Sequence, residues 1–310
     1  MNLLKLEIVV LIKKYKKLTI VAEKLGVKQP TITFHIKSLE EELGVPLFEL
    51  RSGRYFLTEA GEALHHYACK IDALMKEARR VTQEFKDFHK GAITIGASYV
   101  PATYLLPEII HQFQCEFPNI KITLMVKTAP EIRKMLQNHE IDLGVISAAP
   151  FDESLLQKTK IMPDTLVLAF SKEHHFSKKE NVSLQDIEKE RILLHRNPST
   201  TRDLLTKWML EHNITFQSEI ELDSLETMKQ ILKYGNGVAF ISKLAIEQEV
   251  HRNELCYIPI PGFEFQRNIY TIHHEDRWNS KIISFLLHNI TSYAAKKLKG
   301  CRYIRQPFKL

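Results

Sequence analysis

Apolar side chains recur with a helical period at the start of the chain. Between Leu3 and Ile12 their spacing is close to 3.6 residues, which predicts a helix. The residues that follow predict two further helices that meet at Gly26, where a tight turn needs the positive φ that glycine adopts easily. Ala22 lies four residues before this glycine, and its small side chain allows the second helix to pack closely across the first. The pattern therefore predicts a helix-turn-helix.

The second of these helices has an apolar face and a polar face. Its apolar residues point inward and leave outward Lys28, Gln29, Pro30, Thr31, Thr33, Phe34 and Lys37. Glutamine can pair bidentately with adenine, threonine can contact base edges, and lysine can bind phosphate, so this face has the chemistry for reading DNA. The alternative at this point is an ordinary helical hairpin whose polar face meets water.

The next segment, PLFELRSGRYFLTEAGEAL, favours the DNA-reading interpretation. It predicts two short strands joined at Ser52-Gly53, and then a helix capped by Thr58. A β-hairpin directly after a helix-turn-helix is a wing. Arg51 and Arg54 on this hairpin are placed to reach phosphates or the minor groove.

A long helix is predicted from Thr58 to about His89, because only Gly61 interrupts a run without proline or glycine. Apolar or small residues recur along it at alternating steps of three and four, which is the heptad seam of a two-stranded coiled coil. The seam residues are Leu64, Tyr67, Ile71, Leu74, Ala78, Val81, Phe85 and Phe88. We therefore expect the chain to dimerise through this helix, with a helix packed on its own domain as the alternative.

After Gly91 the pattern alternates between strands and helices, which predicts parallel α/β sheets. The expected strands are residues 93–95, 120–126, 142–146, 166–170, 192–195, 238–241 and 268–273, and the expected helices are 104–117, 129–138, 199–212 and 225–234. Ligands of such sheets bind at the carboxyl ends of strands, near helix N-termini. The polar residues expected there are Ser98, Tyr99, Val100, Ser147, Asn197, Ser199, Thr200, Thr201 and Arg202. The alternative is that Ser199 or Thr200 is only a helix cap and Arg202 a surface charge.

The charge of the chain is unevenly distributed. Residues 1–58 hold ten Lys/Arg against six Asp/Glu, and the last fifteen residues hold six basic residues and no acid, within a total of +6. The middle is therefore net acidic, and the DNA-reading segment is basic. No apolar run reaches membrane-spanning length, and the order of charges at the N-terminus differs from that of a secretory signal, so we expect a cytoplasmic protein that is not bound to membranes.

Enzymes and metal proteins are the rival classes. The sequence has no nucleophile elbow, Walker loop or His-Glu-x-x-His motif, so we predict no catalytic residues, and the four scattered cysteines indicate neither disulfides nor structural zinc. The pairs His174-His175 and His273-His274 are adjacent, and on a strand they would point to opposite faces. We therefore predict no metal site and no cofactor. A solute-binding protein for transport is a third class, disfavoured by the N-terminal DNA reader and the lack of a signal peptide.

The run from Leu18 to Leu64 resembles the DNA-binding domain of the LysR-type transcriptional regulators. The residues that carry the resemblance are Ala22–Leu25, Gln29–Thr33, Ile36–Glu40, Leu43–Phe48 and Leu57–Gly61. The chain departs from the family pattern at Leu50, where an arginine is usual, and at Phe34, where a polar or basic residue is common. The resemblance implies a linker-helix dimer that assembles into a tetramer, and an effector region of two α/β subdomains like a periplasmic binding protein, joined by two crossing strands. It also supports effector binding near Ser98 and in the loop 197–202.

The predicted organisation combines both lines of reasoning. A winged helix-turn-helix occupies residues 1–58, a dimerising linker helix 59–90, a first effector subdomain 91–161 with 267–298, a second 162–266, and a basic tail 299–310. The predicted function is a sequence-specific transcriptional regulator controlled by a small anionic effector. Its expected partners are double-stranded operator DNA, further copies of the chain and the effector, with RNA polymerase as a further candidate.

Overall fold

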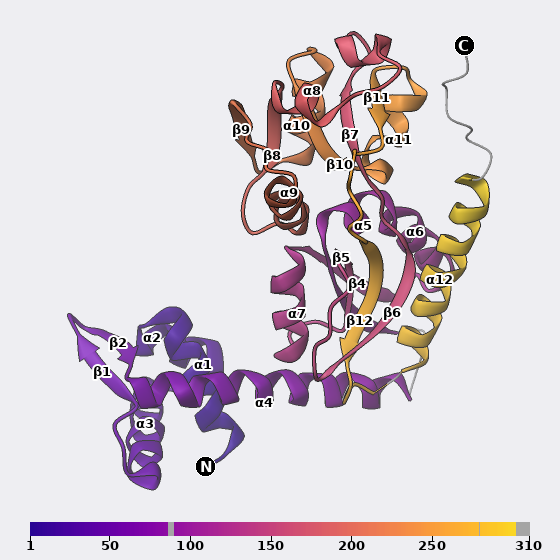
Figure 1. Ribbon diagram of the computed structural model, residues 1–310. Helices are drawn as coiled ribbons and strands as arrows, with labels where there is room; N and C mark the ends of the chain where they lie inside the picture. The colour runs from indigo at the N-terminus through magenta and orange to yellow at the C-terminus, as the bar shows by residue number, and fades with distance from the viewer. Residues whose placement is uncertain (86–89, 279, 302–310) are drawn as a thin grey trace. The chain divides into compact units, whose positions relative to one another are not determined.

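Three helices and a two-stranded ribbon form the start of the chain in the computed structural model (Figure 1). They are followed by a long helix, and the elements are α1 (Leu3–Tyr15), α2 (Leu18–Leu25), α3 (Gln29–Leu43), β1 (Phe48–Arg51), β2 (Arg54–Leu57) and α4 (Glu59–Glu84). The structure describes residues 1–85, 90–278 and 280–301. The chain divides near residue 87 into two compact units.

The helix-turn-helix is built as its pattern predicts. Gly26 ends α2 with a φ of 65°, and its amide hydrogen is donated to carbonyls of the last turn. Ile32 and Ile36 of α3 are buried against Val21 and Ile12. Pro30 lies in the first turn of α3, where a missing N–H leaves no helical hydrogen bond unmade. The apolar faces of three helices thus form the core that fixes α3.

The long helix begins with the predicted cap, because the Thr58 hydroxyl accepts the amide hydrogen of Gly61 at 3.1 Å. Gly61 has a further role that helix propensity does not reveal. A Cβ at this position would lie 2.1 Å from the carbonyl oxygen of Leu47, so only glycine allows the helix to approach the chain before the wing. In the described residues α4 ends at Glu84, and the last predicted seam residue, Phe88, lies outside them.

The first sheet of the C-terminal unit has the strand order β4-β3-β5-β12-β6. Its strands are β3 (Gly91–Ala97), β4 (Ile120–Val126), β5 (Leu143–Ala148), β6 (Leu156–Pro163) and β12 (Asn268–His274). Helices α5 (Tyr99–Tyr104), α6 (Leu106–Glu116) and α12 (Lys281–Cys301) share a buried core with one face, and α7 (Ala129–Gln137) packs on the other. This is a three-layer subdomain (Figure 1).

The second sheet has the order β11-β7-β10-β8-β9. Its strands are β7 (Leu166–Ser171), β8 (Arg191–His195), β9 (Ser218–Leu222), β10 (Val238–Ser242) and β11 (Leu255–Ile258). One face is covered by the 3₁₀ turn η1 (His175–Lys178), α8 (Leu184–Glu188) and α9 (Thr200–Glu211), and the other by α10 (Leu225–Lys233) and α11 (Lys243–His251). The chain enters this subdomain after β6 and leaves it before β12.

Two predictions about this unit need correction. The sheets are mixed rather than parallel throughout, because β12 and β6 in the first sheet and β7 and β11 in the second run antiparallel to their neighbours. The helix expected over 104–117 begins instead at Leu106, after a break at Leu105. Pro107 explains the break, since proline is accommodated in the first turn of a helix and not in its interior. Tyr99 and Val100 accordingly belong to a separate short helix, α5.

Candidate functional site

The outer face of α3 presents the predicted DNA-reading side chains to solvent. Gln29, Thr31 and Lys37 are exposed, and Thr33 is half-buried, with its hydroxyl donating to the Gln29 carbonyl at 3.3 Å. Phe34 lies on the same face with 66% of its surface exposed. Phe34 thus places an apolar ring beside these polar groups, a combination that is chemically suited to contact with a thymine methyl.

The electrostatics of this helix favour an anion at its N-terminus. The first turn holds no acidic residue, and Lys28 stands at the N-cap. Among the residues that the structure describes, neither Lys28 nor Lys37 has a carboxylate within ion-pair distance. Lys28 therefore adds to the positive end of the helix dipole, an arrangement suited to phosphate, and Lys37 adds a second positive charge further along the helix.

The wing turns at Ser52-Gly53, where both residues have positive φ values of 49° and 71°. Such a turn matches the twist of the two strands and places Arg51 opposite Arg54. Arg54 is exposed, whereas Arg51 forms an ion pair with Glu49 at 2.5 Å. Arg54 is consequently the stronger candidate for a phosphate contact. Arg51 would first have to break its ion pair with Glu49 before it could bind a phosphate.

Two contacts hold the wing in place, and the sequence reasoning missed both. The Glu40 carboxylate of α3 accepts the amide hydrogens of Leu47 at 2.7 Å and Phe48 at 3.0 Å, where β1 begins. The amide hydrogen of Tyr55 in β2 is donated to the carbonyl of Lys16, between α1 and α2. The wing is thus fixed to α3 and to the turn between α1 and α2. The spacing of Glu40 from the strand carries no motif, so only the structure reveals this role.

In the first effector subdomain the structure brings Ser98 and Ser147 together. The Ser98 hydroxyl accepts the amide hydrogen of Ser147 at 2.8 Å, so the ends of β3 and β5 are joined side by side. The Ser147 hydroxyl is itself buried and has no hydrogen-bond partner in the described part of the chain. Of the neighbouring predicted residues, Tyr99 is exposed and Val100 packs against the core. Ser147 is therefore the group here with unused hydrogen-bonding capacity.

In the second subdomain the loop 197–202 leads into α9. Ser199 caps this helix, with its hydroxyl accepting the Arg202 amide hydrogen at 3.5 Å, which is the plainer of the two alternatives considered for it. Arg202 is not a free surface charge: it lies 3.9 Å from Glu219, and its Nη1 is buried without a hydrogen-bond partner in the described residues. Asn197 is exposed and Thr200 half-buried.

A buried polar cluster joins the two passages between the subdomains. Arg267 pairs with Asp164 at 2.7 Å, and both side chains are almost fully buried. Arg267 also donates to the Thr201 hydroxyl at 2.6 Å, and the Ser242 hydroxyl donates to Asp164. Of these residues only Thr201 was predicted from the sequence, and Asp164 and Arg267 were not. A buried ion pair produces no periodic pattern in a sequence. The one feature that could have pointed to Arg267 is a charged residue directly before an apolar strand.

His195 ends β8 beside this cluster. Burial, followed by the nearby Arg267 cation, lowers the pKa of His195 from its ordinary value to about 4. The imidazole is therefore neutral at physiological pH. It can donate or accept a hydrogen bond here without adding charge.

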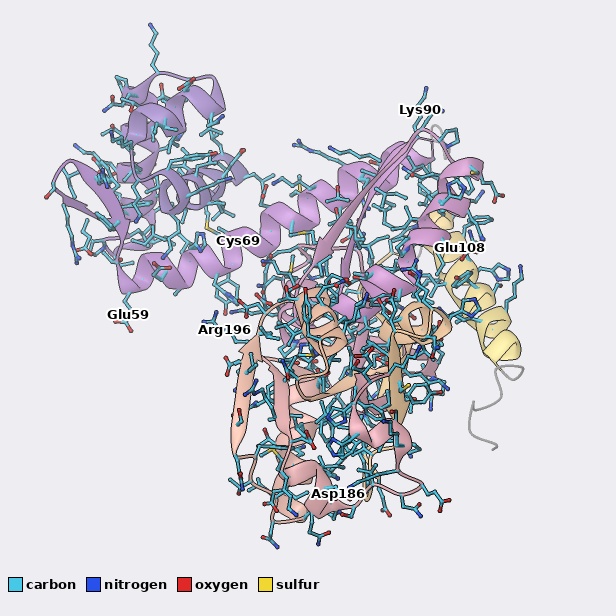
Figure 2. All side chains as sticks on the ribbon, turned by 90° about the horizontal axis from the view of Figure 1, so that it is seen from above. Glu59, Cys69, Lys90, Glu108, Asp186 and Arg196 are labelled. Carbon is cyan, nitrogen blue, oxygen red and sulfur yellow. The ribbon has the colours of Figure 1, made fainter. Side chains whose placement is uncertain are left out.

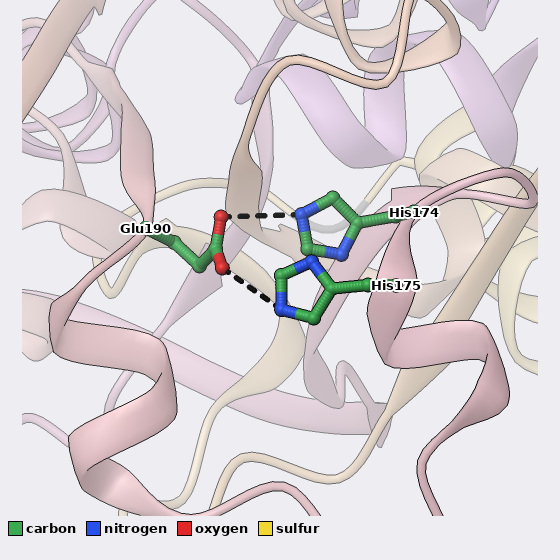
Figure 3. A group of neighbouring side chains, drawn as sticks. All are labelled: His174, His175 and Glu190. Carbon is green, nitrogen blue, oxygen red and sulfur yellow. Dashed lines mark hydrogen bonds and ion pairs between the residues drawn. The ribbon is translucent and has the colours of Figure 1, made fainter.

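The reasoning that adjacent histidines diverge was wrong for one of the two pairs. His174 and His175 are not on a strand: His174 caps the 3₁₀ turn η1, and the two rings stack with centroids 4.5 Å apart. Glu190, distant in sequence, meets both rings (Figure 3). His273 and His274 do lie on β12 and differ in burial, as alternation on a strand predicts.

No helix in the described part of the chain is long and apolar enough to cross a membrane.

Two family models match the chain. The model described as "Bacterial regulatory helix-turn-helix protein, lysR family" matches residues 3–62, and the "LysR substrate binding domain" matches residues 86–294. The chain is 33% identical over 265 residues to the "Probable RuBisCO transcriptional regulator" of Gracilaria tenuistipitata var. liui, an alignment that covers 84% of this chain and 86% of the relative.

Solved structures share the fold. Full-length CbnR complexed with its target DNA has a TM-score of 0.64 at 18% identity, and covers 96% of this chain and 99% of that one. The regulatory domain of CcmR from Synechocystis PCC6803, in complex with 2-PG, has a TM-score of 0.59 at 22% identity, and covers 66% of this chain and 97% of that one. The arrangement of reader, linker helix and paired α/β subdomains is thus a known one.

Proposed function

Because this chain belongs to the LysR family of DNA-binding transcriptional regulators, we propose that a small anion controls it. The anion would bind to polar residues at the ends of β5 and β8 and in the loop after β8. The observation that carries this proposal is a pair of unused polar atoms. Ser147 Oγ in one subdomain and Arg202 Nη1 in the other are buried and lack protein partners among the described residues. Buried polar atoms without partners cost about 1–3 kcal/mol each, and a ligand that bonds to them removes that cost.

The charges around these atoms favour a ligand of negative charge. The Arg267 cation is already neutralised by Asp164, but Arg202 lies 3.9 Å from its only ion-pair partner in the described residues, Glu219. The twelve-residue helix α9 starts at the same loop, and its positive end adds to the attraction. The complex of CcmR with 2-PG and that of QuiR with shikimate show that related regulatory domains bind small molecules.

Ligand binding would act on the passages between the subdomains. Thr201, beside the proposed ligand contacts, is held by Arg267, which stands at the start of the strand that returns to the first subdomain. A ligand that binds one arrangement of the subdomains more tightly shifts the population toward that arrangement. We propose that this shift changes how the two DNA readers of an oligomer are presented.

The oligomer itself is proposed to form through α4. Tyr67 and Leu74 of the heptad seam are 63% and 44% exposed in the single chain, and Phe85 just beyond the helix is 78% exposed. Large apolar side chains at these spacings on one helix are typical of a coiled-coil interface. A dimer places two readers on two half-sites, which raises affinity without new contacts. Pairing of dimers into a tetramer remains the family-based expectation.

In DNA recognition we propose a division of roles. Gln29, Thr31, Thr33 and Phe34 would contact bases, while Lys28, Lys37, Arg51 and Arg54 would hold the backbone or the groove wall, and Pro30 would fix the first turn of the helix. Their support is the exposure and charge of the α3 face and the wing.

Calorimetric titration of the full chain with 2-PG, shikimate and uncharged analogues of similar size tests the effector proposal. Ser147→Ala is the informative variant, because Ser147 Oγ bonds no protein atom among the described residues, and we therefore expect its loss to leave the fold unchanged. We expect Ser147→Ala and Arg202→Gln to weaken anion binding at least about tenfold, equivalent to ~1.4 kcal/mol. Ser177→Ala, whose hydroxyl bonds the His174 carbonyl, is the matched control and should bind like the parent. Tighter binding of an uncharged analogue, or parent-like binding by both variants, would refute the proposal.

A further inference from the structure

Three potential metal ligands converge at the far end of the second subdomain. Nε2 of His174 and Nε2 of His175 each lie 3.2 Å from a different oxygen of the Glu190 carboxylate (Figure 3). One ligand atom from each of the three residues lies within 4.8 Å of the others. A zinc ion bound tetrahedrally at about 2.0–2.2 Å holds its ligand atoms roughly 3.3–3.5 Å apart. The two His–Glu distances of 3.2 Å are therefore close to what an ion requires, and the 4.8 Å limit for the whole set allows for closure around the ion.

We propose that His174, His175 and Glu190 form a binding site for a divalent transition-metal ion of the zinc type. Two imidazoles and one carboxylate are a common ligand set for zinc with an open fourth position, and nitrogen ligands disfavour Mg²⁺ and Ca²⁺. His175 is exposed, so the fourth position faces solvent and can take water. This inference does not rest on the proposed effector function.

His174 and the backbone of Glu190 are held in place before any ion binds. The His174 ring is buried and lies edge-on to Phe176, with centroids 4.7 Å apart. Its backbone carbonyl accepts hydrogen bonds from both the amide and the hydroxyl of Ser177. Glu190 follows α8, where its amide hydrogen is donated to Ile187. Ligands that are already fixed lose little conformational freedom on binding, which favours affinity.

The hydrogen bonds of the His174 ring bear on metal binding. Burial lowers the pKa of His174, and the Glu190 carboxylate only partly offsets this effect. One contact must change. The amide hydrogen of Phe176 is now donated to Nδ1 of His174 at 3.3 Å, and a metal on Nε2 puts the ring proton on Nδ1. That long hydrogen bond opens, whereas those of Ser177 are independent of the ring.

The site is separate from the proposed effector contacts. The chain enters β7 at the passage between subdomains and reaches His174 after the whole strand, a distance of about 20 Å at ~3.3 Å per residue. Figure 2 shows Asp186 of α8 and Arg196, which follows β8, at opposite ends of the subdomain. A metal here stabilises the far end of the subdomain and does not touch an effector.

Equilibrium dialysis of the metal-free full chain against micromolar Zn²⁺ tests this site, together with Co²⁺ substitution followed by visible absorption. Loss of a residue that only hydrogen-bonds to a metal ligand weakens metal binding by up to about 100-fold. His175 and Glu190 would be ligands themselves, so we expect His175→Ala and Glu190→Gln each to weaken Zn²⁺ binding at one site by more than that. His175 is exposed and Glu190→Gln keeps the shape, so both variants should fold.

A second variant controls for zinc binding at cysteine residues. His65–Cys69 and His111–Cys115 are pairs that could also bind zinc, so a Cys69→Ser, Cys115→Ser double variant is the matched control. It should retain the ion that His175→Ala loses, and its Co²⁺ spectrum should lack thiolate charge-transfer bands. The proposal is overturned if the parent binds no Zn²⁺, or if His175→Ala and Glu190→Gln bind as many ions with the same affinity as the parent.

Discussion

Arg267 donates a hydrogen bond to the hydroxyl of Thr201 at 2.6 Å, and this bond ties the start of β12 to the first turn of α9. Thr201→Val keeps the volume of the side chain but leaves a buried guanidinium nitrogen without this acceptor. We expect a loss of about 1–3 kcal/mol in the free energy of unfolding, measured by urea titration. Thr201→Ser restores the hydroxyl and should recover most of that loss. Equal stability of Thr201→Val and the parent would mean that the bond contributes nothing.

Gln29 and Arg54 should affect DNA binding in different ways. Gln29→Ala should lower the preference for operator over random DNA by about 1–3 kcal/mol, because a base-edge contact is lost. Arg54→Ala should weaken both DNAs alike and reduce the salt dependence by about one phosphate contact. Fluorescence anisotropy at several salt concentrations measures both quantities. The assignment of Gln29 is wrong if the specificity ratio of its variant equals that of the parent.

The exposed seam of α4 predicts the behaviour of a charge substitution. Tyr67→Glu with Leu74→Glu places charges where two helices would meet, so the oligomer should dissociate. Light scattering at fixed concentration measures the mass. His66→Glu, one residue off the seam and also exposed, is the control and should leave the mass unchanged. An unchanged mass in the double variant would remove α4 from the interface.

His195 should make stability depend on pH. Its folded-state pKa of about 4 lies below the ordinary 6.5. Between pH 4 and 6.5 the imidazole is therefore protonated in the unfolded chain and neutral in the folded chain. Its contribution to stability is therefore present above pH 6.5 and is lost as the pH falls toward 4, by up to about 3 kcal/mol. His195→Asn should flatten the urea-unfolding profile over that interval. The exposed His251→Asn is the control, and a parent-like slope in His195→Asn would contradict the prediction.

Elements with one clear apolar face were predictable from the sequence. The bounds expected for β4, 120–126, agree with the structure, and Gly26 adopts the expected left-handed conformation. Unpredicted strands lie at the edges of sheets. β6 has four consecutive exposed residues, Gln157 to Lys160, and β11 has only four residues, so neither shows a clear alternation. β9 does alternate in burial, but two of its five residues are glutamates, which strands disfavour.

The residues of the candidate sites also differ in how far the sequence predicts them. Exposed groups on a periodic helix, such as Gln29 and Lys37, follow from the pattern of that helix. Pairings across the fold do not: nothing in the sequence sets Glu190 beside His174, or Arg267 beside Asp164, because these pairs are 16 and 103 residues apart. Their geometry depends on how whole strands are ordered in the sheet.

The two passages between the subdomains have a consequence for engineering. Asp164 and Arg267 stand side by side, since the Asp164 amide hydrogen is donated to the Arg267 carbonyl at 3.0 Å. The segment between them is therefore a continuous insertion whose two ends already meet. Such a segment can be cut out at this one junction and replaced by the matching segment of another regulator without changing the strand order of either sheet. Chimaeras built at this junction would exchange the proposed ligand contacts of the second subdomain in a single cloning step and leave the sequence of the DNA reader unchanged.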